Sequence, residues 1–248
     1  MILEYHRPKN LGEAFDLLGR VSPVTVPLGG GTTLSQNARD DVAVVDLQAL
    51  ALDQLEIQGN SFRIGAAVTL QQLLESSDIP LALKDAIRLE ATLNTRNSAT
   101  VAGKLVTCDG SSPFGTVLLA MDTRLVWLPG EIELALGDWL PLRSVTKPGR
   151  LIAQLVCPKQ TDVRFAAIGR TPQDRPLVCA AVATWSSGRT RVALGSVGYA
   201  PLLAMDGTDR NGAESAAENA YSQLHTYLTS NEYLKEITRK LVNRLLTE

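Results

Sequence analysis

The fold is decided by the stretch Val24-Thr25-Val26-Pro27-Leu28-Gly29-Gly30-Gly31-Thr32-Thr33-Leu34, in which a β-branched run precedes three glycines and two hydroxyl residues. Glycine has no Cβ, so its backbone adopts positive φ easily and a ligand can approach the main chain closely. Successive backbone N–H groups in such a turn can form a concave anion-binding site. The stretch therefore predicts a short buried strand and a turn, which either holds the phosphates of a nucleotide-like cofactor or only connects the strand to a short helix.

The composition of the whole chain narrows the classes of function. The 248 residues are 45% hydrophobic and 20% charged, with a formal net charge of −2. This length allows one large domain or two modest ones. A net charge of −2 does not favour binding of nucleic acid or of an anionic membrane surface, so neither is an expected partner. Since the sequence contains neither an apolar run of membrane-spanning length nor a signal-peptide pattern, we expect a cytoplasmic protein.

The cysteines and histidines argue against a metal held by this chain alone. Cys108, Cys157 and Cys179 are odd in number and widely separated, and no Cys-x-x-Cys pair is present. They cannot supply the ligands of an iron–sulfur cluster or of a zinc site with the usual spacing, and we expect them to be buried small hydrophobes. His6 and His225 lie far apart, outside any His-Glu-x-x-His pattern.

The elements around the glycines do not match a dinucleotide-binding βαβ unit. A capping box at Asn10 and Glu13 predicts a helix over residues 11–19, and a second apolar strand covers residues 42–47. The segment between the strands, residues 32–39, has room for at most two or three helical turns and has almost no apolar face. Asp46 lies roughly where a ribose-binding acid would, but a Rossmann fold needs a full crossover helix, and no Gly-Lys-Ser/Thr sequence indicates a P-loop.

The middle of the chain contains a second informative stretch, residues 94–105. It is rich in Asn, Thr and Ser, which hydrogen-bond their own backbone, so we expect an ordered loop that places the positive charges of Arg96 and Lys104. The elements expected around it are listed in chain order: a strand at 61–68, a helix from Thr69, a helix at 81–90, a helix at 116–121, a hairpin of 124–128 with 131–135, and a strand at 150–157.

The pattern changes after a linker at residues 158–162. Three strands (163–169, 177–185 and 189–197) precede two helices (213–228 and 232–246), which suggests a separate α+β unit. Trp127, Trp139 and Trp185 are expected to be core residues rather than ligand platforms.

Five stretches, in this order along nearly the whole chain, carry the signature of a known family: Tyr5-His6-Arg7-Pro8, Gly29-Gly30-Gly31-Thr32-Thr33-Leu34, Ile64-Gly65-Ala66, Arg96-Asn97-Ser98-Ala99-Thr100-Val101-Ala102-Gly103-Lys104 and Asn231-Glu232-Tyr233-Leu234. They resemble the FAD-binding medium subunit of the molybdenum hydroxylases, which include xanthine dehydrogenase and the flavoprotein subunit of carbon monoxide dehydrogenase.

This resemblance implies an α+β fold: a two-subdomain FAD-binding domain like that of vanillyl-alcohol oxidase (PCMH type) at residues 1–158, divided near residue 55. A small C-terminal domain with a three-stranded sheet and helices follows at 162–248, like that of the CO dehydrogenase flavoprotein. The resemblance also implies FAD as cofactor, with its pyrophosphate on the two glycine-bearing loops. The implied cofactor-binding residues are Leu28, Gly29, Gly30, Gly31, Thr32, Thr33, Leu34, Asn97, Thr100, Ala102, Gly103 and Lys104.

The resemblance further implies an oxidoreductase subunit whose flavin takes electrons from iron–sulfur clusters and delivers them to an acceptor. The clusters and the molybdenum centre would lie on separate chains, a [2Fe-2S] small subunit and a molybdopterin-binding large subunit. This agrees with the cysteine count, because no cluster ligands are available here. The chemistry would be that of the cofactor, while the protein binds and tunes it.

The second loop departs from the family pattern, and this leaves alternatives open. Ala102-Gly103-Lys104 stands where the family has Gly-Gly-Asn, although Lys104 retains a charge that can pair with a pyrophosphate. Gly110-Ser111-Ser112-Pro113 lacks the aspartate of the family's Pro-x-Ser-Asp, and Phe165-Ala166 replaces a Phe-Lys pair. One hypothesis is an electron-transfer flavoprotein subunit; another is a flavin-free relative with a structural or assembly role. Nothing favours an independent hydrolase, since no Gly-x-Ser-x-Gly elbow is present.

Overall fold

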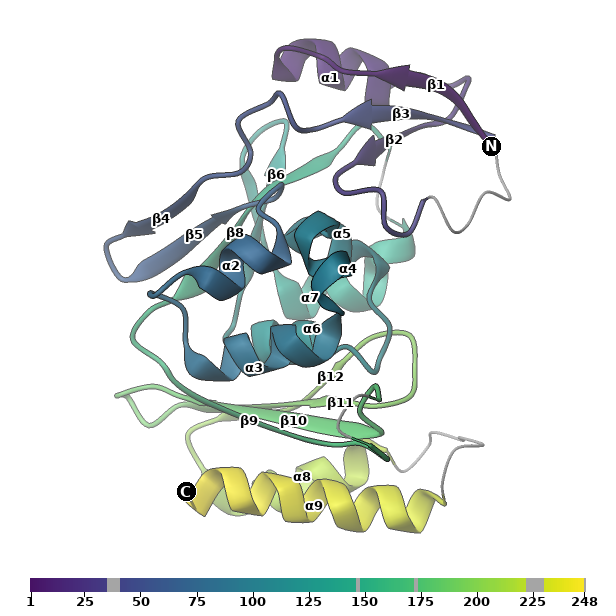
Figure 1. Cartoon of the computed structure of the whole chain (residues 1–248). Coiled ribbons are helices and arrows are strands. Elements are labelled where there is room, and N and C mark those ends of the chain that lie inside the picture. The colour runs from purple at the N-terminus through teal and green to yellow at the C-terminus, as the bar shows by residue number, and fades with distance from the viewer. Residues whose placement is uncertain (35–40, 146–147, 172–173, 222–229, 248) are drawn as a thin grey trace. The chain divides into compact units, whose positions relative to one another are not determined.

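A computed structural model describes residues 1–34, 41–145, 148–171, 174–221 and 230–247 (Figure 1). The chain forms two compact units, each assembled from separate stretches of sequence. Unit 1 comprises Met1–Ser76, Leu93–Thr107 and Arg124–Val156, and unit 2 comprises Ser77–Thr92, Cys108–Thr123 and Cys157–Glu248. The division into domains at residues 158–162 stays a prediction.

A three-stranded parallel sheet opens unit 1, with strand order β1 (Ile2–His6), β3 (Val42–Asp46), β2 (Thr25–Leu28). Helix α1 (Leu11–Leu18) buries Ala14 and Leu18 against this sheet, in a cluster with Val45 and Leu47. As predicted, the side chain of Asn10 caps α1 by accepting from the N–H of Glu13 at 2.9 Å. The reciprocal bond differs from a capping box, because Glu13 accepts from the N–H of Lys9.

A five-stranded sheet forms the larger part of unit 1, with strand order β4 (Leu55–Gln58), β5 (Ser61–Gly65), β8 (Leu151–Pro158), β6 (Arg124–Leu128), β7 (Ile132–Ala135). The predicted hairpin is confirmed as β6 and β7. The helices of this unit are short: α2 (Leu70–Glu75), α4 (Leu93–Ser98), α5 (Val101–Thr107) and α7 (Leu136–Trp139), which runs into the 3₁₀ helix η1 (Leu140–Val145).

The prediction of a loop over residues 94–105 is wrong, because α4 and α5 occupy this stretch with only Ala99 and Thr100 between them. The polar residues of this stretch favour helix ends rather than exclude helices. Thr100 accepts the N–H of Gly103 at 3.2 Å with its hydroxyl, as residues at helix starts commonly do. Apolar Val101, Ala102 and Leu105 then lie on the buried face of α5.

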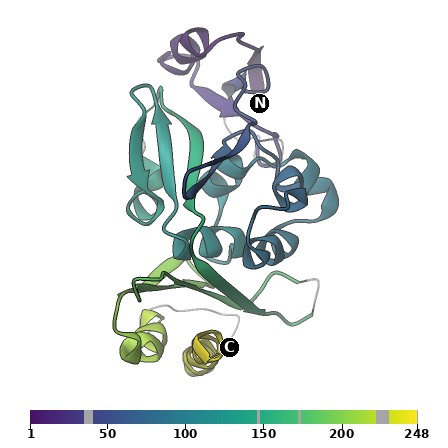
Figure 2. The same cartoon turned by 90° about the vertical axis from the view of Figure 1, so that its left-hand side faces the viewer.

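Unit 2 is built on a four-stranded antiparallel sheet with strand order β12 (Leu202–Gly207), β11 (Thr190–Gly195), β10 (Val178–Thr184), β9 (Asp162–Ile168). Helices α3 (Leu81–Glu90) and α6 (Pro113–Ala120) cover one face, and α8 (Ala213–Ala220) and α9 (Asn231–Thr247) cover the other (Figures 1 and 2). Every residue of β10 except Thr184 is buried, as expected for a strand between two helical layers.

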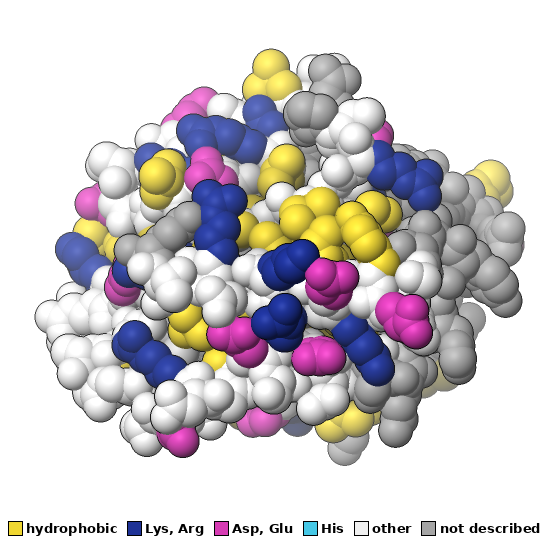
Figure 3. Space-filling view, turned by 90° about the horizontal axis from the view of Figure 1, so that it is seen from below, with side chains coloured by type: hydrophobic (Ala, Val, Ile, Leu, Met, Phe, Trp, Pro, Cys, Tyr) yellow, Lys and Arg dark blue, Asp and Glu magenta, His cyan; other side chains and the backbone are white. Residues whose placement is uncertain are grey.

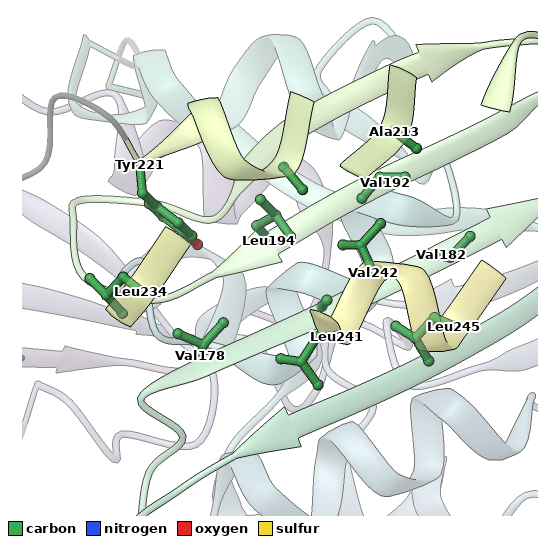
Figure 4. Packing of buried hydrophobic residues seen from close by; sticks show 12 residues of the cluster. Val178, Val182, Val192, Leu194, Ala213, Tyr221, Leu234, Leu241, Val242 and Leu245 are labelled. Carbon is green, nitrogen blue, oxygen red and sulfur yellow. The ribbon is translucent and has the colours of Figure 1, made fainter. Parts of the chain in front are cut away.

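The core on the α8–α9 side consists of side chains from β10, β11 and both helices (Figure 4). Its members are Val178, Ala180, Val182, Val192, Leu194, Ala213, Ala217, Tyr221, Leu234, Leu241, Val242 and Leu245. The two helices therefore share one apolar core with the sheet, in the predicted order of strands followed by helices. The separate C-terminal unit stays a prediction, because unit 2 also includes Ser77–Thr92 and Cys108–Thr123.

The prediction of three strands in this unit is too low by one, because it omits β12. Strand β12 lies at the edge of the sheet, half of its residues are exposed, and it contains no β-branched residue, so its sequence carries little strand signal. The predicted helix at 213–228 extends to Ala220 in the described residues, and residues 222–229, with His225, lie outside them, as do residues 35–40.

The surface carries charges of both signs. On the face shown in Figure 3, basic and acidic side chains are interspersed around a small group of hydrophobic side chains. In the part of the chain that the structure describes, no helix is both long and apolar enough to cross a bilayer.

Candidate functional site

The glycine turn follows β2 and packs directly on the link between α4 and α5. A Cβ added to Gly30 would lie 1.5 Å from the carbonyl oxygen of Ser98, and a Cβ on Gly29 would lie 2.5 Å from Oγ1 of Thr100. Gly31 has a φ of +69°, which favours glycine. All three glycines are therefore required by the local structure itself, before any ligand is considered.

The turn leaves backbone donors available. Within the described residues, the N–H groups of Gly29 and Gly30 donate no hydrogen bond, and neither glycine is fully buried. Adjacent unpaired N–H groups in a tight turn attract an anion, because their dipoles point the same way. The first predicted loop thus fits a phosphate group.

The second predicted loop is different, because its first backbone donors are already used inside unit 1. At the start of α5, Val101 N–H donates to Val68 O at 2.9 Å and Ala102 N–H donates to Ala66 O at 3.3 Å. The N–H of Gly103 donates to the hydroxyl of Thr100. The first two bonds join the start of α5 to the segment that follows β5, and the third is local to α5. These three amides are therefore not available to a phosphate.

Two cavities border the glycine turn, and Gly29, Gly30, Gly31, Leu47 and Thr100 line both. The first, here called the Asp46 cavity, has a volume of about 590 Å³. Its remaining lining residues are Tyr5, Arg7, Leu28, Asp46, Gln48, Asp53, Ala67, Thr69, Gln72, Asn97 and Ser98.

The carboxylate of Asp46 is the most buried charge of this cavity, with 4% of its side chain exposed. It accepts hydrogen bonds from the hydroxyl of Tyr5 and from the N–H of Gln48, and Nε of Arg7 lies 3.9 Å away. The bond to Asp46 raises the pKa of Tyr5, because it stabilises the protonated hydroxyl. Asp46 therefore ties β1 to β3 and presents a polar wall rather than a free base.

The second cavity, here called the Trp cavity, has a volume of about 370 Å³. Trp127 and Trp139 line it; both are buried, as predicted, although they also face this cavity, and their ring centres lie 5.6 Å apart. Trp185, also predicted to be a core residue, is only half-buried. Its further lining residues are Val26, Pro27, Thr32, Thr33, Leu34, Ala66, Ala102, Gly103, Val106, Thr107, Arg143, Arg150, Leu151 and Ile152. Mostly apolar walls with a few polar groups are typical of cofactor pockets of this size.

The structure brings most of the predicted site residues together around these cavities. Leu28 and Asn97 line the Asp46 cavity, Thr32, Thr33, Leu34, Ala102 and Gly103 line the Trp cavity, and the three glycines and Thr100 line both. Lys104 lines neither. The residues missed from the sequence include Arg7, Trp127, Arg143 and Arg150, which lie far from the glycine motifs along the chain.

The stretch that replaces the family's Pro-x-Ser-Asp lies in unit 2, at the start of α6. The buried carboxylate of Glu90 accepts the hydroxyl of Ser112 at 2.7 Å and the N–H of Phe114 at 3.0 Å. Ser112 also caps the N–H of Gly115. A helix N-terminus favours an anion, and here the carboxylate of Glu90 takes that place by accepting from the donors at the start of α6.

The cysteines are buried, as predicted, and lie apart from the cavities. Burial raises the pKa of Cys157 to about 11 and that of Cys179 to about 12, because the thiolate is poorly solvated in the interior. They are packing residues of unit 2 and not reactive thiols.

Comparison with known proteins agrees with this geometry. Among curated proteins, the uncharacterized protein YgfM of Escherichia coli strain K12 is 29% identical over 256 residues, covering 100% of this chain and 96% of its own. Among solved structures, carbon monoxide dehydrogenase from Hydrogenophaga pseudoflava lacking the Mo-pyranopterin moiety matches with a TM-score of 0.85 at 20% identity (100% and 96% covered). Quinoline 2-oxidoreductase from Pseudomonas putida 86 matches with a TM-score of 0.83 at 20% identity (100% and 96% covered).

The structural matches confirm the predicted α+β fold over the whole chain. The family model described as the FAD binding domain in molybdopterin dehydrogenase matches residues 1–160, which include the glycine turn, α5 and both tryptophans of the Trp cavity. FAD is accordingly the cofactor of this chain, and the N–H groups of Gly29 and Gly30, which donate to none of the described residues, fit its pyrophosphate. The protein is a member of the family of FAD-binding domains of molybdopterin dehydrogenases.

Proposed function

We propose that this chain is the electron-transfer flavoprotein subunit of a molybdenum hydroxylase-type oxidoreductase. The observation that carries the proposal is the glycine turn, whose Gly29 and Gly30 amides are unpaired among the described residues and which borders two cavities. Bound there, FAD supplies reversible acceptance and release of electrons, while the chain binds and orients it.

Different residues around the glycine turn contact different parts of FAD in this proposal. The amides of Gly29 and Gly30 hold the pyrophosphate, and Thr32 and Thr33 offer hydroxyls on the Trp-cavity side. Trp127 and Trp139 form an apolar wall that excludes water from a planar ring. Leu28 and Asn97 line the Asp46 cavity, where polar side chains suit hydroxyl-rich parts of a ligand.

The partners are part of the same proposal. The three cysteines are single buried thiols in unit 2, so iron–sulfur clusters and the molybdenum centre lie on a [2Fe-2S] small subunit and a molybdopterin-binding large subunit. The matched carbon monoxide dehydrogenase, which lacks the Mo-pyranopterin moiety of its molybdenum cofactor, is a molybdenum enzyme and supports this assignment. A cytoplasmic location belongs to the proposal as well.

The test is to purify the chain, reconstitute it with FAD, remove unbound cofactor and identify the flavin released on denaturation. We expect a yellow protein with FAD at close to stoichiometric amounts. The variant Gly30→Ala should retain less FAD than the parent. Gly207→Ala is the matched control, because its Cβ meets nothing within 4 Å. A protein that stays colourless after reconstitution contradicts the proposal.

One observation favours a second candidate, a flavin-free subunit with a structural or assembly role. The first three amides of α5 and the donors at the start of α6 are engaged within the chain. This candidate predicts a colourless chain that does not bind FAD and still co-purifies with a molybdenum-containing partner when the two are co-expressed.

A further inference from the structure

The glycine turn offers only neutral donors to a doubly charged pyrophosphate. Neutral amides in a turn orient a phosphate, but charge-assisted bonds to arginine are roughly twice as strong as neutral ones. The sequence assigned the cationic role to Lys104, which lines neither cavity. The source of positive charge near the turn therefore has to be sought elsewhere in unit 1.

The two cavities differ sharply in charge. The Asp46 cavity is lined by two carboxylates, Asp46 and Asp53, and one guanidinium, Arg7. The Trp cavity is lined by the guanidinium-bearing Arg143 and Arg150, and its described lining includes no Asp or Glu. An anion that sits against the glycine turn is therefore attracted toward the Trp cavity and repelled from the Asp46 cavity.

The local fold explains how the two arginines reach this cavity. Arg143 lies in η1, which continues directly from α7 and its buried Trp139, and Arg150 immediately precedes β8. Leu151 and Ile152, the first residues of β8, line the same cavity. Among the described residues, the side chain of Arg150 takes part in none of the ion pairs.

We propose that Arg143 and Arg150 form an anion subsite of the Trp cavity that holds the pyrophosphate of the dinucleotide against the glycine turn. The inference rests on the proposed function, because it assigns a role in that same site. It replaces Lys104 as the cation of the site, and it places the phosphates on the tryptophan side of the turn.

The test compares three ligands that differ in charge. FAD and ADP both carry a pyrophosphate, whereas riboflavin has the flavin ring and no phosphate. Dissociation constants are measured by calorimetry for the parent chain, Arg143→Gln, Arg150→Gln and the double variant. Arg124→Gln is the matched control, since Arg124 is an exposed arginine of unit 1 that lines neither cavity.

We expect each single variant to bind FAD and ADP several-fold more weakly and the double variant about tenfold or more weakly, with riboflavin affinity unchanged. Added salt should weaken ADP binding to the parent more than to the double variant, because salt screens the attraction between the arginines and the pyrophosphate, which the double variant lacks. Arg150 is exposed, so Arg150→Gln is expected to fold normally, and its unfolding midpoint in urea checks this.

The other outcomes decide between the two proposals. If the parent binds FAD and the double variant binds FAD and ADP equally well, the anion subsite is wrong and the flavin function stands. If the parent binds ADP with the expected dependence on the arginines but no FAD, the flavin function is wrong and the subsite stands. Equal weakening of riboflavin, or a parent that binds none of the three ligands, contradicts the subsite.

Discussion

The contact between the glycine turn and the α4–α5 link allows a prediction that separates two kinds of steric constraint. A Cβ on Gly29 would meet side-chain atoms of Thr100, Oγ1 at 2.5 Å and Cγ2 at 3.2 Å. A Cβ on Gly30 would meet main-chain atoms of Ser98, the carbonyl oxygen at 1.5 Å and its carbon at 2.4 Å. Carbon atoms pack favourably at about 3.5–4.0 Å, so neither substitution fits without movement. The first clash can be removed by a second mutation, and the second cannot.

The magnitudes follow from the atoms involved. Overpacking of a close contact costs about 1–3 kcal/mol, so we expect Gly29→Ala to lower the free energy of unfolding by about 2 kcal/mol and Gly30→Ala by about 3 kcal/mol. Thr100→Ala costs about 1 kcal/mol, because the N–H of Gly103 loses its acceptor. In that variant the nearest remaining atom to a Cβ on Gly29 is Cβ of residue 100, at an ordinary 3.4 Å. Gly29→Ala should then cost less than about 0.5 kcal/mol, a coupling of about 1.5 kcal/mol.

Urea unfolding of the cofactor-free protein, followed by circular dichroism, measures all four corners of this double-mutant cycle. Gly207→Ala should change stability by no more than about 0.5 kcal/mol, because its Cβ meets nothing. If Gly29→Ala costs the same with threonine and with alanine at position 100, the turn does not pack on Thr100 and the description of the site is wrong.

Three further measurements test unit 2. The hydrogen bonds from Arg189 lower the pKa of Asp206 in the folded protein. The ionised carboxylate therefore stabilises the fold above the unfolded pKa of 3.8, and this stabilisation is lost as the pH falls through the folded pKa. In urea titrations, the stability difference between the parent and Asp206→Asn should shrink below about pH 4. Glu90→Ala leaves two buried donors at the start of α6 unpaired and should lower the free energy of unfolding by about 2–3 kcal/mol. Calorimetry should therefore show a lower Tm, and an unchanged Tm would refute this role of Glu90. Because Cys157 and Cys179 are fully buried with raised pKa values, a thiol reagent at neutral pH should label them only after unfolding, and rapid labelling of the folded chain would contradict their packing.

The sequence predicted the parts of the site that depend on local chemistry. Three consecutive glycines after a β-branched strand are informative by themselves, and the structure places them in a tight turn in which the N–H groups of Gly29 and Gly30 donate to none of the described residues. The capping residues Asn10 and Thr69 likewise predicted helix starts, because a cap acts within three residues of its position. Local rules of this kind need no knowledge of the rest of the chain.

The predictions that were wrong or missing concern contacts between segments that are distant in the sequence. The stretch of α4 and α5 was expected to be a loop. Helix α5 is held by hydrogen bonds from Val101 and Ala102 to the segment that follows β5, at Val68 and Ala66, and an apolar period does not reveal such contacts. Arg143 and Arg150 could not be associated with the turn at Gly29 from spacing alone. Arg150 immediately precedes β8, which lies between β5 and β6 in the sheet, and Arg143 lies in η1 after α7; one sequence does not reveal this arrangement.

The glycines themselves carry two separate constraints, and the structure distinguishes them. Gly29 and Gly30 lack room for a Cβ because of Thr100 and Ser98, so a member of this family that had lost FAD would still retain both residues for packing. Their presence is therefore evidence for the fold, whereas the amides of Gly29 and Gly30 and the proposed arginine subsite bear on the binding of the cofactor. Stability of the cofactor-free chain reports the first constraint, and the affinity difference between FAD and riboflavin reports the second. A variant such as Arg150→Gln should change only the second, whereas Gly29→Ala should change both.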